Sequence, residues 1–149
     1  MTAVKKHHRD LVEAIASRES EKARQLSEAL PSEEYQEYGQ YLAAVFAIFM
    51  EDFFGDKLSR DTIAGFAKRL GEDFRAAGVE YDQTLVENVI RASAGEVSLY
   101  ENLSSGDIVS TQVMIIGRLG VQGTSVRPDL DRFLNDAEEL VAEWEQGEQ

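Results

Sequence analysis

Cysteine is missing from this sequence of 149 residues. Its absence excludes disulfide bonds, thiolate nucleophiles and cysteine-ligated zinc, which stabilise or activate many small proteins. Proline is scarce too, because Pro31 and Pro128 are the only two, and no segment has the biased composition of a disordered tail. We therefore expect an ordered chain that is held together mainly by its apolar core.

Positive charge is also in short supply. The chain has 15 basic and 28 acidic residues, which gives a net charge of −13. A protein that follows a nucleic-acid backbone needs a basic surface, and so does one that binds an anionic membrane. We therefore expect neither nucleic acid nor a membrane as a partner, whereas an acidic surface keeps the chain soluble and suits a basic protein.

No hydrophobic run is long enough to cross a bilayer. The longest, residues 41–50, is about half of the roughly 20 apolar residues that a membrane-spanning helix needs. The first residues are polar and basic and lack the apolar segment of an export signal. A cytoplasmic protein is the simplest expectation.

The same run is the most informative stretch that is present. Residues 41–50 contain no charged side chain, and we predict that they form the middle of a helix over about residues 32–54. A helix that is apolar on every face must be enclosed by other elements. We expect an all-α protein, a single-domain irregular bundle of about six or seven helices around this buried central helix.

The remaining elements fit one domain over residues 1–149. Ser59 and Asp82 each precede a helical pattern as capping residues, with an apolar residue just before the cap and another four positions after it. Residues 96–104 fit either a short helix or an extended piece, and we favour the helix. The other expected segments are an N-terminal helical hairpin at 1–30, a loop at 120–128 and an acidic amphipathic C-terminal helix at 129–146.

Histidine offers little for a metal site. The only two, His7 and His8, are neighbours in the sequence. Adjacent residues of a helix point about 100° apart, so we expect that these two do not share one metal ion. A site of carboxylates alone, for magnesium or calcium, would have to use Glu34 and Glu37 with Glu51 or Asp52. Charged helix ends in solvent explain those acids more simply, so we expect no metal and no cofactor.

Catalytic patterns are missing as well. The sequence contains no Gly-x-Ser-x-Gly elbow and no His-Glu-x-x-His pair. Its 28 acidic residues offer many accidental carboxylate pairs, so pairing alone carries no information. We assign no catalytic residue and expect a protein that is not an enzyme.

Two functional hypotheses follow from the apolar residues. The leading one is a non-catalytic helical module that acts through protein contacts and self-associates as a homodimer. The C-terminal helix, acidic on one face and apolar on the other, would make the contact. Its interaction surface would comprise Phe133, Leu140 and Trp144. The alternative is a domain that binds or senses a small apolar ligand in a pocket between the central helix and a helix at 60–77. That pocket would be lined by Tyr35, Tyr38, Phe46, Phe49 and Phe66.

Overall fold

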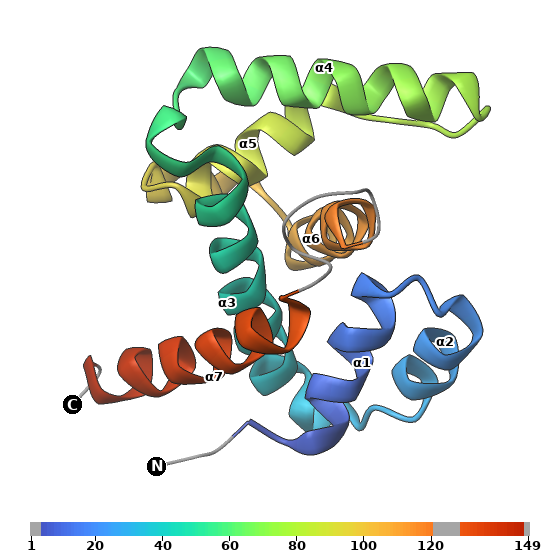
Figure 1. The fold of residues 1–149 in the computed structure, drawn as a ribbon, viewed down its shortest axis with the longest axis vertical. Helices are drawn as coiled ribbons and strands as arrows, with labels where there is room; N and C mark the ends of the chain where they lie inside the picture. Colours follow the sequence, from blue (N-terminus) through green and yellow to red (C-terminus); the bar gives the residue numbers. More distant parts are fainter. Residues whose placement is uncertain (1–3, 121–128, 148–149) are drawn as a thin grey trace. The chain divides into compact units, whose positions relative to one another are not determined.

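A computed structural model describes residues 4–120 and 129–147 of the chain (Figure 1). Helical residues make up 83% of the structure, and the described residues contain no strand, which confirms the all-α fold class. The helices are α1 (Lys6–Ala16), α2 (Ser20–Glu28), η1 (Ser32–Glu34), α3 (Tyr35–Phe54), η2 (Gly55–Lys57), α4 (Arg60–Ala76), α5 (Gln83–Ser93), η3 (Val97–Asn102), α6 (Ser105–Leu119) and α7 (Leu130–Gly147), where η denotes a 3-10 helix. None of the described helices is both long and apolar enough to cross a lipid bilayer.

The contacts of the chain group it into two compact units. The first unit combines Met1–Asp52 with Gln112–Gln149, and the second is Phe53–Thr111. The expectation of a single domain over residues 1–149 is not tested by this grouping and stays a prediction.

The first unit contains most of α3, which is the predicted central helix. Seven side chains of its apolar run are almost fully buried: Tyr41, Leu42, Ala44, Val45, Phe46, Phe49 and Met50. Ala43, Ala47 and Ile48 are only half-buried. The run is therefore buried over most of its circumference, and a narrow strip of small or aliphatic residues stays partly open.

Helix α7 packs against α3 within this unit. The Tyr41 hydroxyl donates a hydrogen bond to the Leu134 carbonyl over 3.2 Å. The ring of Phe133 meets the ring of Phe49 edge to face, with centroids 5.9 Å apart. These contacts explain why a helix with a strongly acidic outer face still folds back, because its other face covers the aromatic side of α3. The predicted C-terminal helix at 129–146 is thus found as Leu130–Gly147.

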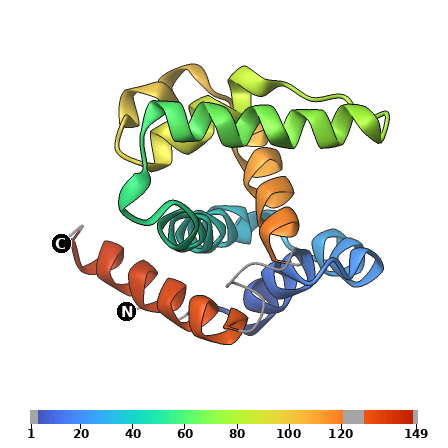
Figure 2. The same cartoon turned by 45° about the horizontal axis from the view of Figure 1, so that its top comes forward.

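Helices α1 and α2 form the predicted N-terminal hairpin and lie side by side (Figure 2). Arg18 makes the turn in the left-handed conformation, with φ at 55°. Its N–H donates to the Ile15 carbonyl, and the next N–H, of Glu19, donates to the Ala14 carbonyl. This pattern is the Schellman motif, in which glycine is the usual residue at the position of Arg18.

The end of α6 lies against the end of α1. A Cβ added to Gly117 would lie 3.4 Å from the Ile15 carbonyl oxygen, and one added to Gly120 would overlap the backbone of Ala16. Glycine is therefore needed at 120 to let two backbones approach each other. The rest of the expected loop at 120–128 lies outside the described residues.

The second unit confirms both predicted helix starts. The Ser59 hydroxyl accepts a hydrogen bond from the Thr62 N–H, and the Thr62 hydroxyl accepts one from the Ser59 N–H, which makes a reciprocal capping box. The Asp82 carboxylate accepts from the Leu85 N–H over 3.1 Å. Residues 97–102, left open between helix and extended structure, form the 3-10 helix η3.

Aromatic rings and one ion-pair network hold the second unit together. The rings of Phe53, Phe54 and Phe66 meet edge to face, with centroids 5.0 to 5.9 Å apart. Glu96, just before η3, pairs with both Arg91 of α5 and Arg60 of α4, each over 2.6 Å. One carboxylate thus ties three successive elements of this unit.

Candidate functional site

Two histidines and one glutamate, side chains that could together bind a metal ion, lie close together where α1 begins. His7 and His8 stand in the first turn of α1, and Glu34 ends η1 just before α3. The Nε2 atoms of both imidazoles approach one carboxylate oxygen, Glu34 Oε1, at 2.5 Å from His7 and 2.8 Å from His8. We call these three side chains the His–His–Glu cluster.

The two imidazole rings reach the same carboxylate oxygen although they belong to neighbouring residues of one helix. The expectation that these two residues do not share one metal ion is not tested by this contact. The ring centroids are 4.5 Å apart, and the rings are inclined by 67°. The Nε2 atoms of both rings therefore converge on one oxygen of Glu34.

The members of the cluster differ in their exposure to solvent. The His8 side chain is 1% exposed, whereas Glu34 is 18% and His7 47% exposed. The His8 ring also meets the Tyr38 ring edge to face at 6.1 Å. His8 is therefore held by packing, while His7 retains freedom to turn.

Charges around the cluster partly compensate each other. The hydrogen bond from His7 is the main cause that lowers the pKa of the Glu34 carboxyl below its ordinary value, and the nearby charge of Lys5 adds to it. Lys5 itself pairs with Glu37 over 3.3 Å. Glu34 is thus favoured as a carboxylate and keeps its acceptor oxygens available.

A small hollow adjoins the cluster. It has a volume of about 20 Å³ and is lined by His8 and by residues of three segments, namely Val4, Lys5, Glu37, Gln40, Val141 and Glu145. A cavity of this size holds a water molecule. It is far too small for an organic ligand, whose pockets measure about 300–1,000 Å³.

The other acidic residues considered for a metal do not gather here. Glu51 and Asp52 are exposed near the end of α3. They follow Glu34 by more than four helical turns, which is about 25 Å along the axis. Only Glu34 of the four carboxylates meets the histidines.

The residues predicted to line a ligand pocket are spread over both units. Tyr35 is 58% exposed, while Tyr38, Phe46 and Phe49 are buried in α3. Burial raises the pKa of Tyr38 to about 12. Phe66 belongs to the second unit, where it packs on Phe53 and Phe54. A pocket between the central helix and the 60–77 helix stays a prediction.

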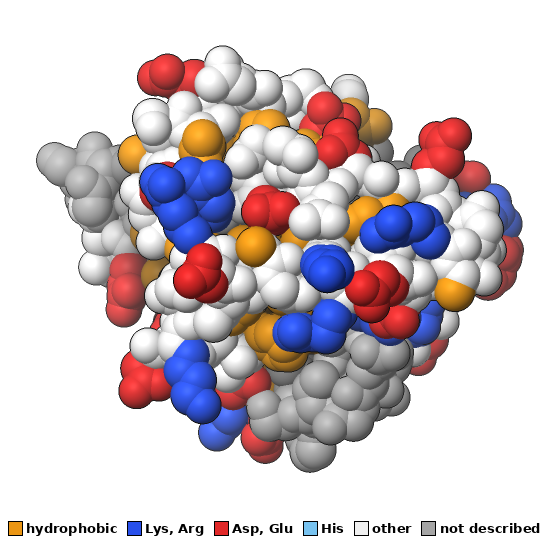
Figure 3. Space-filling view, turned by 90° about the horizontal axis from the view of Figure 1, so that it is seen from above, with side chains coloured by type: hydrophobic (Ala, Val, Ile, Leu, Met, Phe, Trp, Pro, Cys, Tyr) orange, Lys and Arg blue, Asp and Glu red, His pale blue; other side chains and the backbone are white. Residues whose placement is uncertain are grey.

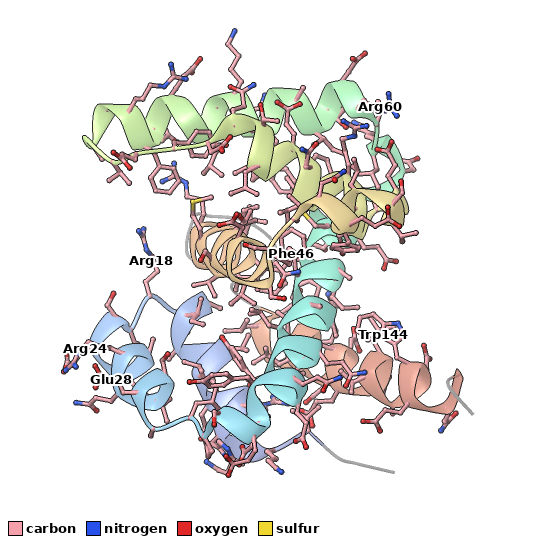
Figure 4. All side chains as sticks on the ribbon, turned by 180° about the vertical axis from the view of Figure 1, so that it is seen from behind. Arg18, Arg24, Glu28, Phe46, Arg60 and Trp144 are labelled. Atoms are coloured by element: carbon pink, nitrogen blue, oxygen red, sulfur yellow. The ribbon has the colours of Figure 1, made fainter. Side chains whose placement is uncertain are left out.

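The residues of the predicted interaction surface differ in accessibility. Phe133 is 4% exposed because it packs on Phe49, and Leu140 is half-buried. Trp144, labelled on α7 in Figure 4, is 37% exposed. Trp144 is thus the member of this set that presents a large apolar surface to solvent.

Comparison with protein-family models, with curated proteins and with solved structures gives no significant match.

Proposed function

We propose that this chain is a non-catalytic helical protein-interaction module that self-associates through the C-terminal part of α7. The observation that carries the proposal is the apolar stripe of this helix. Leu130, Phe133, Leu134, Ala137 and Val141 are all buried, and Trp144 continues the stripe three residues further with 37% of its surface exposed.

The apolar stripe of α7 therefore continues for about one helical turn beyond Val141, the last of its residues that is buried within the first unit. Leu140 precedes Trp144 by four residues, so the two side chains are neighbours on the helix surface. Tryptophan is among the residues that contribute most to protein interfaces, because a large rigid ring is desolvated at little cost in side-chain entropy. Acidic residues flank Trp144 in the sequence, at Glu143 and Glu145, and a polar border of this kind is typical of the rim of an interface.

The rest of the molecule offers less to a partner on the face shown in Figure 3. Basic and acidic side chains alternate there, and the apolar atoms form separate small patches. Singly exposed apolar residues of this kind are normal on soluble proteins. Trp144 differs from such scattered residues in its position, because it continues an apolar stripe of α7 whose preceding members are buried.

A second copy of the chain is the occupant that we propose. A two-fold symmetric dimer needs only one self-complementary surface, and two α7 helices could bury their Trp144 side chains against each other. Each copy carries a charge of −13, so the copies repel at low salt. Salt screens this repulsion, and self-association should become stronger as ionic strength rises. Binding to a basic protein partner would instead become weaker as ionic strength rises, because salt screens the attraction between opposite charges.

Sedimentation equilibrium of the untagged chain tests this proposal. We expect a monomer–dimer equilibrium whose dimer fraction is larger at about 0.5 M than at about 0.05 M NaCl. Trp144→Ala should shift the chain to monomer, whereas the control Tyr35→Ala, which removes an exposed ring elsewhere in the first unit, should not. A wild-type chain that is monomeric at both salt concentrations, or a Trp144→Ala variant that dimerises as well as wild type, would refute the proposal.

A further inference from the structure

The geometry points to a binding site for one divalent transition-metal ion of the zinc type, formed by His7, His8 and Glu34. This inference is independent of self-association through α7. The donor atoms of these three residues all lie within 4.8 Å of one another. No other group of three or more such side chains is brought together in this way among the described residues.

The donor set selects the kind of metal. Two imidazole nitrogens and one carboxylate oxygen suit zinc, iron, nickel and copper ions, whereas magnesium and calcium prefer ligands that are all oxygen. Three protein ligands also leave a coordination position for water, which is typical of zinc sites that are not purely structural.

The distances require only a small adjustment. Ligand atoms at 2.0–2.1 Å from a tetrahedral zinc lie roughly 3.3 Å apart. The two Nε2 atoms are now 2.5 Å and 2.8 Å from Glu34 Oε1, so each of these two separations must widen by less than about 1 Å. His7 and Glu34 can make this movement because they are partly exposed, and packing holds His8 in place.

The local charge permits a cation. Glu34 and Glu37 contribute two negative charges, and Lys5 contributes one positive charge that is already paired with Glu37 over 3.3 Å. Metal binding would displace the protons that now lie between the imidazoles and the carboxylate. It would also join the first turn of α1 to the end of η1, and so stabilise the first unit.

Calorimetric titration of the full, untagged chain with ZnCl₂ tests the site, with MgCl₂ in excess to occupy weak carboxylate sites. We expect one zinc ion per chain. His7→Ala and Glu34→Gln should each weaken the affinity by about 100-fold or more, since even the loss of an outer partner of a metal ligand costs 10–100-fold. The matched control Glu33→Gln removes the same charge from an exposed neighbour and should bind like wild type.

Cobalt(II) supplies an independent readout. A nitrogen- and oxygen-ligated tetrahedral cobalt ion absorbs visible light strongly, and this absorption should appear with the wild type and with Glu33→Gln but not with Glu34→Gln. Zinc should also raise the unfolding temperature of the wild type and leave that of His7→Ala unchanged. Absence of a one-to-one zinc complex in the wild type would overturn the inference. Undiminished binding by both ligand variants would do so as well, since it would place the metal on other surface acids.

Discussion

Replacing Gly120 by alanine should destabilise the first unit through a collision between two backbones. The added Cβ would lie 2.8 Å from the carbonyl carbon of Ala16 and 3.0 Å from its Cα, and nearer still to its carbonyl oxygen. Ordinary contacts of a Cβ begin at about 3.4 Å. A side chain in the way could rotate to another position, but these are backbone atoms at the end of α1 and cannot. The ends of α1 and α6 must therefore move apart.

The expected cost follows from two opposing effects. Overpacking of a close-packed site typically costs 1–3 kcal/mol, so we start from about 2 kcal/mol. Alanine also restricts the unfolded chain more than glycine does, and this effect raises the free energy of unfolding by about 0.4–1 kcal/mol. The net destabilisation should be about 1–2 kcal/mol. For a chain of this length that corresponds to a fall of roughly 2–8 °C in the unfolding temperature.

Gly39→Ala is the matched control. Gly39 lies in α3, and an added Cβ there would have no neighbour within 4 Å. Without such a contact, the better helix propensity of alanine should stabilise the protein by about 0.5–1 kcal/mol. The same chemical change should thus have opposite signs at the two positions.

Urea and thermal unfolding measure both variants. Trp144 is the only tryptophan and lies in α7, so its fluorescence follows the first unit, while circular dichroism follows all helices. A Gly120→Ala variant that is as stable as wild type, with an unchanged denaturant slope, would show that α1 and α6 are not in backbone contact.

Two further predictions concern acid stability and the first helix turn. Arg91 and then Arg60 lower the pKa of Glu96 to about 2, so its ionised form stabilises the fold above the ordinary value of 4.5, and this contribution is lost as the pH falls towards 2. The unfolding temperatures of wild type and Glu96→Gln should therefore converge between about pH 5 and pH 2, and a constant difference would contradict the pairing. Arg18→Gly should raise the stability by about 0.5 kcal/mol in urea unfolding, because glycine adopts the left-handed conformation without strain. Glu19→Gly should lower the stability, because Glu19 has an ordinary φ of −82° and glycine gains nothing there. Equal effects of the two substitutions would argue against strain at Arg18.

Local rules in the sequence determined much of the secondary structure. The helix starts at Ser59 and Asp82 were predictable because a capping side chain bonds to an N–H only three residues away. The ends at Gly55, Gly78 and Gly95 were predictable for a similar reason, since all three adopt positive φ where a helix stops. The start of α2 follows no such rule: Ser20 is its first helical residue, and Glu19 before it makes no side-chain cap. The burial of most of residues 41–50 followed from composition, because a run without a charged side chain gains free energy when it leaves water.

Only the tertiary structure brought distant residues together. Glu34 meets His8 across 26 positions, and neither residue carries a sequence pattern that announces the pairing. The close backbone contact of Gly120 with Ala16 was not predictable from the sequence either, because a glycine after a helix usually indicates only that the helix ends there. Sequence periodicity reports which face of a helix is apolar, whereas the partner of that face depends on how the helices pack in space. The candidate metal site likewise depends on how the helices pack, because its ligands come from α1 and η1.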